Sequence, residues 1–192
     1  GSGVIDGSIM EAETRNIAFT LLTNRHVVTQ DITLVHPVTK DVKTVSDVPA
    51  DRCSIEMLNN STIYYVSQKG GIFFNTSGPD FAALQVENKD DKFKAVGIKQ
   101  HCKKGLTRIG DEVVVLGYPA IGSTQGITAT EGIISGIENE YYVTSAKIDH
   151  GNSGGVAVSV KNNCYLGIPT FVEGGELESL GRILDINAFW SN

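Results

Sequence analysis

One short segment of this chain has the residue types and spacing for nucleophilic chemistry. Residues 151–155 read Gly-Asn-Ser-Gly-Gly, so that Ser153 stands on a glycine-rich turn. Backbone N–H groups that converge on such a turn can stabilise the oxyanion formed when a serine attacks a carbonyl. A plain glycine-rich turn without a chemical role is the alternative interpretation.

A serine nucleophile needs a general base, and the base needs a group that orients it. The candidate base is His26, at the end of the apolar stretch 21–28, where a strand would hold its imidazole in one orientation. The candidate acid is Asp80, directly before the apolar stretch 81–86. A carboxylate buried there needs a partner, and a histidine N–H suits it. A histidine satisfied at a strand end and an aspartate capping a strand entry are the alternatives.

The remaining histidines narrow the choice of mechanism. His36 and His101 have the surroundings of surface residues, and His150 stands too close to Ser153 to act as its base, although it can line the cleft. The segment around the serine also fits the G-x-S-x-G turn of α/β-hydrolases, but that fold places its acid and its histidine after the serine. All four histidines precede Ser153, which excludes that fold.

Many short strands must position these residues. Runs rich in β-branched and aromatic residues recur from residue 18 to residue 186, separated by glycine and asparagine turns, with short helical turns expected after His26 and near the C-terminus. This pattern predicts an all-β fold of paired barrels. A polar connection suggests a boundary near residue 98. We therefore expect an N-terminal barrel, 1–98, with His26 and Asp80, and a C-terminal barrel, 99–192, with Ser153.

Composition excludes several classes of function. The chain has 192 residues, 41% hydrophobic and 20% charged, which suits a folded core and argues against disorder. Its net charge of −6 argues against nucleic-acid binding. No apolar run has the length of a membrane span, and no signal peptide is visible. The localisation therefore stays unknown from these features alone.

The cysteines add a weak indication of compartment. Cys53, Cys102 and Cys164 are odd in number, with no short spacing that would indicate a zinc site or a disulfide framework. We expect them to be reduced, which leans towards a cytoplasmic protein.

Residues 23–28 (Thr-Asn-Arg-His-Val-Val), 80–84 (Asp-Phe-Ala-Ala-Leu), 116–119 (Leu-Gly-Tyr-Pro) and 151–155 together resemble the trypsin-like serine peptidases. The closest likeness is to the protease domain of the HtrA-like branch. The resemblance implies two six-stranded antiparallel β-barrels of the chymotrypsin type, with peptide hydrolysis in the cleft between them. It implies a protein or peptide substrate, and neither a cofactor nor a metal.

The resemblance also assigns roles to individual residues. His26 would be the general base, Asp80 its orienting acid and Ser153 the nucleophile. The N–H groups of Gly151 and Ser153 would form the oxyanion hole. An extended substrate would pair with the strand that follows the serine, at Thr170, Phe171 and Val172.

Specificity and activation depend on positions near the serine. Lys147 corresponds to the base of the primary pocket in trypsin, where it and His150 could attract acidic side chains; we favour the alternative that Lys147 points to solvent from a shallow pocket. Asn152 is not the aspartate that zymogen-activated trypsins use, which argues against activation by N-terminal insertion. A latent protease that needs a domain or partner outside this chain, and a non-catalytic peptide-binding module, remain the alternatives.

Overall fold

The computed structural model describes residues 2–10, 17–50, 52–56, 63–67, 72–74, 78–88, 100–119, 126–170 and 180–189. The chain is almost entirely β, as predicted, and both expected helical turns are present. The elements are β1 (Val4–Met10), β2 (Ile17–Thr23), α1 (Arg25–Val28), β3 (Thr29–Val35), β4 (Val42–Pro49), β5 (Arg52–Glu56), β6 (Ile63–Ser67), β7 (Ile72–Phe74), β8 (Ala82–Asn88), β9 (Glu112–Gly117), β10 (Thr128–Glu138), β11 (Tyr141–Thr144), β12 (Val156–Ser159), β13 (Cys164–Thr170), β14 (Gly181–Asp185) and the 3-10 helix η1 (Ile186–Ala188). Within these ranges, no helix has the length and apolar character needed to cross a membrane.

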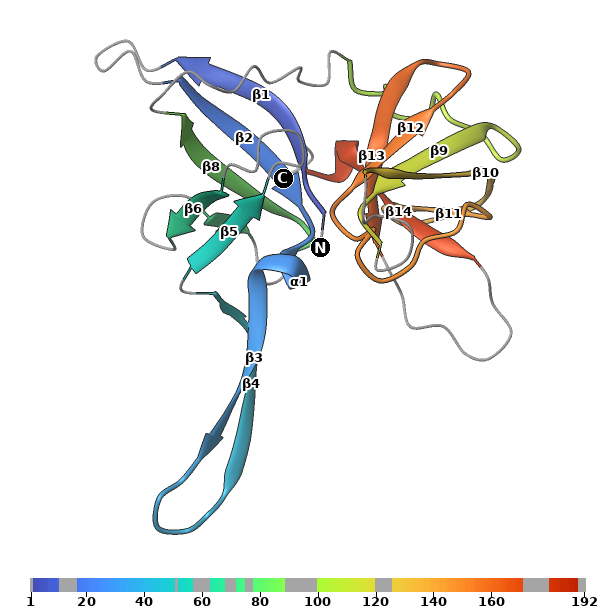
Figure 1. The fold of residues 1–192 in the computed structure, drawn as a ribbon. Coiled ribbons are helices and arrows are strands. Elements are labelled where there is room, and N and C mark those ends of the chain that lie inside the picture. The colour runs from blue at the N-terminus through green and yellow to red at the C-terminus, as the bar shows by residue number, and fades with distance from the viewer. Residues whose placement is uncertain are drawn as a thin grey trace.

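The C-terminal half is a closed antiparallel barrel with the strand order β10-β11-β14-β13-β12-β9 (Figure 1). Strands such as β9, β11 and β12 alternate between buried and less buried side chains, as the wall of a barrel requires, whereas β13 is buried along its whole length. In β9, Val113 and Val115 are buried at 1% exposure, and Val114 between them is partly exposed. Ile134, Ala157 and Leu166 fill the same core at 0% exposure.

The N-terminal half is more open in the part that the structure describes. Its largest sheet has the strand order β1-β2-β8-β7, and β3–β4 and β5–β6 form two separate two-stranded sheets. Closure of a barrel requires hydrogen bonds between every pair of neighbouring strands. Among the described strands of this half these pairings do not complete a ring, so they do not show a closed N-terminal barrel. The boundary predicted near residue 98 lies outside the described residues.

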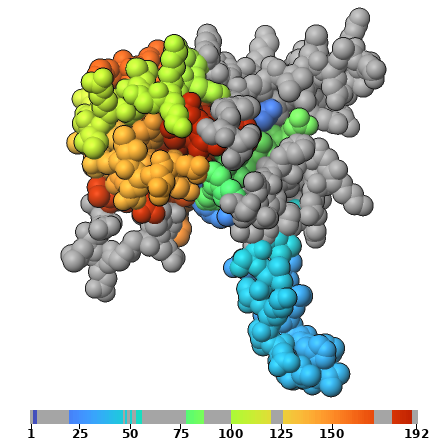
Figure 2. All heavy atoms as spheres, turned by 180° about the vertical axis from the view of Figure 1, so that it is seen from behind, coloured from blue at the N-terminus to red at the C-terminus, as the bar shows by residue number. Residues whose placement is uncertain are grey.

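The hairpin of β3 and β4 projects from the body of the molecule (Figures 1 and 2). Its register runs from Thr29 opposite Pro49 to Val35 opposite Val42, with one irregularity. Several of its apolar side chains are exposed, including Val38 at 81%. The sequence predicts a strand at residues 33–36, within or beside β3, but none over β4, because β4 shows no apolar alternation of the kind that burial selects.

The two halves share a hydrophobic core. Successive side chains of a strand point to opposite faces, so β2 places Leu21 in a cluster of the N-terminal half and Leu22 in a cluster between the halves. β8 does the same with Leu84 and Ala83. From the barrel, Ile168 and Leu184 pack into this shared cluster at 1% and 2% exposure.

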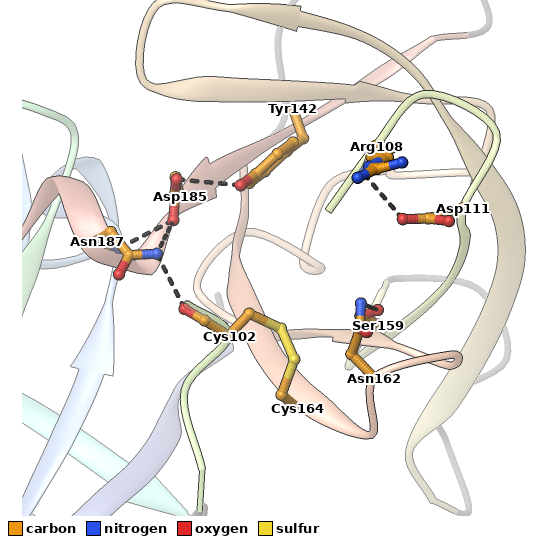
Figure 3. The surroundings of a disulfide bond; sticks show 9 residues. All are labelled: Cys102, Arg108, Asp111, Tyr142, Ser159, Asn162, Cys164, Asp185 and Asn187. Carbon is orange, nitrogen blue, oxygen red and sulfur yellow. Dashed lines mark hydrogen bonds between the residues drawn. A yellow bond between two sulfur atoms is a disulfide. The ribbon is translucent and has the colours of Figure 1, made fainter. Parts of the chain in front are cut away.

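A disulfide joins Cys102 to Cys164, which corrects the expectation of reduced thiols (Figure 3). A parallel bridge between His101 and Tyr165, together with the hydrogen bond from Cys102 N to Tyr165 O of 2.8 Å, brings the two cysteines side by side. Sequence spacing could not show this, because the pair is 62 residues apart and is joined through β13. Cys53 remains free, and the lean towards the cytoplasm loses the support of reduced thiols.

Candidate active site

His26 and Asp80 form a hydrogen-bonded pair at one end of the N-terminal sheet. β2 and β8 are neighbours with Thr23 opposite Ala82, so the residues just beyond those positions emerge together. His26 Nδ1 lies 2.6 Å from Asp80 Oδ2, and the His26 backbone N–H donates to Asp80 Oδ1 at 3.1 Å. One carboxylate therefore fixes both the ring and the backbone of the histidine.

The electrostatics of the pair determine which ring nitrogen is available. Burial raises the pKa of Asp80, but the hydrogen bonds from His26 and the nearby charge of Arg25 act in the opposite direction, and the pKa lies below its usual value. An ionised carboxylate only accepts hydrogen bonds, so Nδ1 of His26 must carry the proton. The other ring nitrogen, Nε2, then has the lone pair of a base. The imidazole side chain is 46% exposed, against 19% for the carboxylate, so a substrate can reach the ring.

The turn around Ser153 has a backbone that only glycine allows at two positions. Gly151 has φ of 98° and Gly154 has φ of 85°, both in the left-handed region. A Cβ on Gly151 would overlap the carbonyl of Tyr118, and one on Gly154 would overlap the carbonyl of Ser2. The glycines therefore allow the turn to pack tightly, with Ser153 4% exposed.

Hydrogen bonds within the turn hold its shape. The Asn152 N–H donates to Asp149 O at 3.0 Å, and the Gly155 N–H donates to Asn152 O at 2.9 Å. The Gly154 N–H donates to Pro169 O of β13 at 3.1 Å, which ties the turn to the barrel wall. The candidate nucleophile is thus carried by the closed barrel.

A buried asparagine joins the two halves beside the His26–Asp80 pair. Asn24, at 0% exposure, donates from Nδ2 to Asp80 O and to Thr170 Oγ1, both at 2.8 Å. Sequence analysis missed this residue. Its signal was an asparagine directly before α1, a position typical of helix caps, but its side chain makes no capping bond and reaches across to β13 instead.

Tyr141 of β11 also approaches Asp80 from the barrel. Burial raises the pKa of its hydroxyl, against a hydrogen bond with the Asp80 backbone that lowers it. The tyrosine packs against the cluster shared by the two halves. Tyr141 thus brings a side chain of the barrel half close to Asp80.

The other predicted residues have the following positions. Lys147 and His150 have exposed side chains, and their predicted roles in specificity stay predictions. Thr170 is 7% exposed, with its hydroxyl bonded to Asn24 and its backbone opposite Arg182 of β14. Phe171 and Val172 lie outside the described residues. In the described part of the chain, no group of three or more His, Cys, Asp or Glu side chains is placed to hold a metal ion.

A closed β-barrel thus carries the Gly-Asn-Ser-Gly-Gly turn, and the other half of the chain carries a histidine–aspartate pair. The family model of the trypsin-like peptidase domain matches residues 1–168, and the chain belongs to that family. A search of curated proteins finds no significant match.

Proposed function

We propose that this chain is a serine endopeptidase that hydrolyses peptide bonds of protein substrates through an acyl-enzyme intermediate. The observation that carries the proposal is the pair of hydrogen bonds between His26 and Asp80, which leaves Nε2 of the imidazole as the base. Membership of the trypsin-like peptidase family supports the same activity. Within that family, the motifs at 23–28 and 151–155 favour the HtrA-like branch.

In the proposed mechanism, Ser153 Oγ attacks the scissile carbonyl carbon while His26 Nε2 takes the hydroxyl proton. Asp80 stabilises the imidazolium that forms. The N–H groups of Gly151 and Ser153 donate to the oxyanion of the tetrahedral intermediate. His26 then gives its proton to the leaving amine, and the C–N bond breaks. Water then attacks the acyl carbon while His26 takes a proton from it, the bond between that carbon and Ser153 Oγ breaks, and His26 returns the proton to Oγ, which releases the acid and restores Ser153.

We further propose that an extended substrate adds to the barrel along residues 170–172, beside the strand that follows the nucleophile. Residues 1–98 would then form the first barrel, which supplies the base and acid, and residues 99–192 the second. This division puts the reacting groups on both sides of one cleft, a common place for a ligand site.

Ser153→Ala tests the proposal. With fluorescein-labelled casein as substrate, we expect kcat to fall by roughly 10⁴- to 10⁶-fold with the fold unchanged by circular dichroism. Ser159→Ala is the matched control, because Ser159 is a buried serine whose hydroxyl accepts a hydrogen bond from Asn162 elsewhere in the barrel. Hydrolysis that survives Ser153→Ala would refute Ser153 as the nucleophile.

Labelling with a fluorophosphonate separates the alternatives. An active or latent protease forms an adduct on Ser153 that mass spectrometry locates. A wild-type protein that neither labels nor cleaves casein would instead be a peptide-binding module. One that labels but cleaves casein slowly would be a latent protease.

A further inference from the structure

Ser2 lies inside the candidate active site, although it stands at the start of the chain. It is 5% exposed and contacts three separate segments. Its hydroxyl donates to Gly151 O at 2.5 Å and accepts from the Tyr118 N–H at 2.9 Å. Its backbone N–H donates to Ser153 O at 2.8 Å, and its carbonyl accepts from Thr23 Oγ1 at 2.7 Å. Ser2 therefore connects the end of β2, the end of β9 and the nucleophile turn.

These contacts fall on the peptide groups on either side of the Ser153 amide. In the peptide group between residues 151 and 152, Ser2 Oγ holds the carbonyl and Asp149 O holds the N–H. In the peptide group between residues 153 and 154, the Ser2 N–H holds the carbonyl and Pro169 O holds the N–H. Both peptide groups therefore have a hydrogen bond at the carbonyl and another at the N–H, and Ser2 makes the bond to the carbonyl in each case.

The side chain at position 2 must both donate and accept. A hydroxyl does this with one small group, because it carries one O–H donor and two lone pairs. Alanine at this position would leave the carbonyl of Gly151 and the N–H of Tyr118 without their hydroxyl partner in a buried place. The backbone bonds of Ser2 would remain.

The position of Ser2 is itself fixed from two sides. Thr23 holds its carbonyl, and Gly154 packs so closely against that carbonyl that a Cβ there would overlap it and the Thr23 hydroxyl. Thr23 is 1% exposed and lies three residues before His26 in the sequence. The backbone of Ser2 thus forms a hydrogen-bonded link from the base-bearing half to the nucleophile turn.

We propose that Ser2 is a positioning residue for the oxyanion hole, which sets the direction of the Gly151 and Ser153 N–H groups through the two carbonyls that it holds. This inference rests on the proposed function. The amides of an oxyanion hole act because they already point at the place where the oxyanion forms. Loss of the Ser2 hydroxyl leaves the peptide group between residues 151 and 152 held only at its N–H, and the neighbouring amides then lose part of their alignment.

The test is pre-steady-state hydrolysis of p-nitrophenyl acetate by Ser2→Ala, since the burst of nitrophenolate reports acylation alone. The loss of one oxyanion donor costs on the order of 10²- to 10³-fold, so misalignment should slow the burst rate constant by about 10- to 100-fold. The burst amplitude, the ester concentration for half-saturation and the pH profile of the rate should stay those of the wild type. A merely structural role would instead lower the amplitude, because fewer chains would be folded.

Two further variants keep the proposal open to refutation. Ser159→Ala removes another buried hydroxyl and should keep the wild-type burst rate. Thr23→Val removes only the hydrogen bond to the Ser2 carbonyl, and should slow the burst by a smaller factor, about 3- to 10-fold, which Thr23→Ser restores. If Ser2→Ala does not fold, the test is the comparison of the burst rate constants of Thr23→Val and Thr23→Ser.

The outcomes separate this inference from the proposed function. Ser153→Ala should show no burst in the same assay. If Ser153→Ala is inactive while Ser2→Ala and Thr23→Val keep the wild-type burst rate, only the role of Ser2 is wrong. If the burst persists in Ser153→Ala, the proposed nucleophile itself is wrong.

Discussion

The two halves of the molecule differ in how completely they enclose their residues. The C-terminal barrel closes on itself, and its core includes Ile134 and Leu166 at 0% exposure. In the described part of the N-terminal half, the sheets stay separate, and the β3–β4 hairpin exposes Leu34 at 53% and Val38 at 81%. The candidate nucleophile thus belongs to the enclosed half, and its base to the more open one.

Because the base and the candidate nucleophile belong to different halves, the orientation of His26 towards Ser153 depends on the contacts between the halves. Asn24 reaches Thr170, Ser2 reaches the turn at Ser153, and Tyr141 approaches Asp80. The shared apolar cluster also joins the halves, but apolar burial is non-directional. Hydrogen bonds at fixed atoms are what can set the orientation of a histidine towards a serine.

The largest effect is expected from the base-bearing half. Asp80→Asn keeps the size of the side chain but offers an amide where the histidine needs an acceptor, so the imidazole loses its required tautomer. We expect kcat on casein to fall by about 10⁴-fold, with the fold unchanged by circular dichroism. Asn162→Asp provides a charge-change control in the barrel. An Asp80→Asn enzyme within tenfold of wild type would contradict the role of the pair.

The next largest effect is expected on the free energy of unfolding, when the disulfide of the barrel half is removed. The disulfide closes a loop of 62 residues, and the chain-entropy argument gives about 4 kcal/mol of stabilisation for a loop of that length. Cys102→Ala with Cys164→Ala should lower the free energy of unfolding by roughly that amount in urea titrations. Cys53→Ala, at the free cysteine, is the control. Equal stabilities of the double variant and the wild type would show that the crosslink does not constrain the unfolded chain.

A smaller effect is expected at the asparagine between the halves. Asn24→Ala removes one buried and one partly buried hydrogen bond, and we expect about 1 to 3 kcal/mol of destabilisation and roughly a tenfold loss of kcat. A double-mutant cycle with Thr170→Val isolates the bond across the halves. Additive effects in that cycle would mean that Asn24 and Thr170 are not coupled.

The sequence could predict the parts of the site that a motif carries in a few consecutive residues. The β-rich runs predicted the fold class, and the structure does bring His26 and Asp80 within hydrogen-bond distance. The glycines around Ser153 predicted a tight turn, and positive φ angles at Gly151 and Gly154 confirm it.

The contacts that join distant segments could not be predicted in this way. Ser2, Asn24 and the disulfide each involve at least one partner more than 60 residues away, for example Gly151 at a separation of 149 residues from Ser2. No local periodicity or spacing encodes such a partner. The exposed strand β4 was missed for a different reason, because it lacks the buried face that produces an apolar alternation.

The smallest effect concerns the pH dependence of stability, and it tests the base-bearing half alone. The pKa of Asp80 is lowered in the folded state from an ordinary value of 3.8, so the unfolded chain binds its proton at higher pH than the folded chain does. The stabilisation from the His26–Asp80 pair is therefore fully present above that ordinary value and is lost as the pH falls through the folded pKa. Urea midpoints measured between about pH 6 and pH 2.5 should fall more steeply for the wild type than for Asp80→Asn.

Asp111, a carboxylate of the barrel half, provides a comparison for the pH dependence of stability. A hydrogen bond from the Arg108 backbone lowers the pKa of Asp111, so Asp111→Asn should also flatten the acid limb. Because the two carboxylates belong to different halves and share no partner, their effects should add in the double variant. If Asp80→Asn has the same slope as the wild type while Asp111→Asn does not, the histidine would not favour the ionised form of Asp80, and the assignment of Nδ1 as the protonated nitrogen would lose its basis.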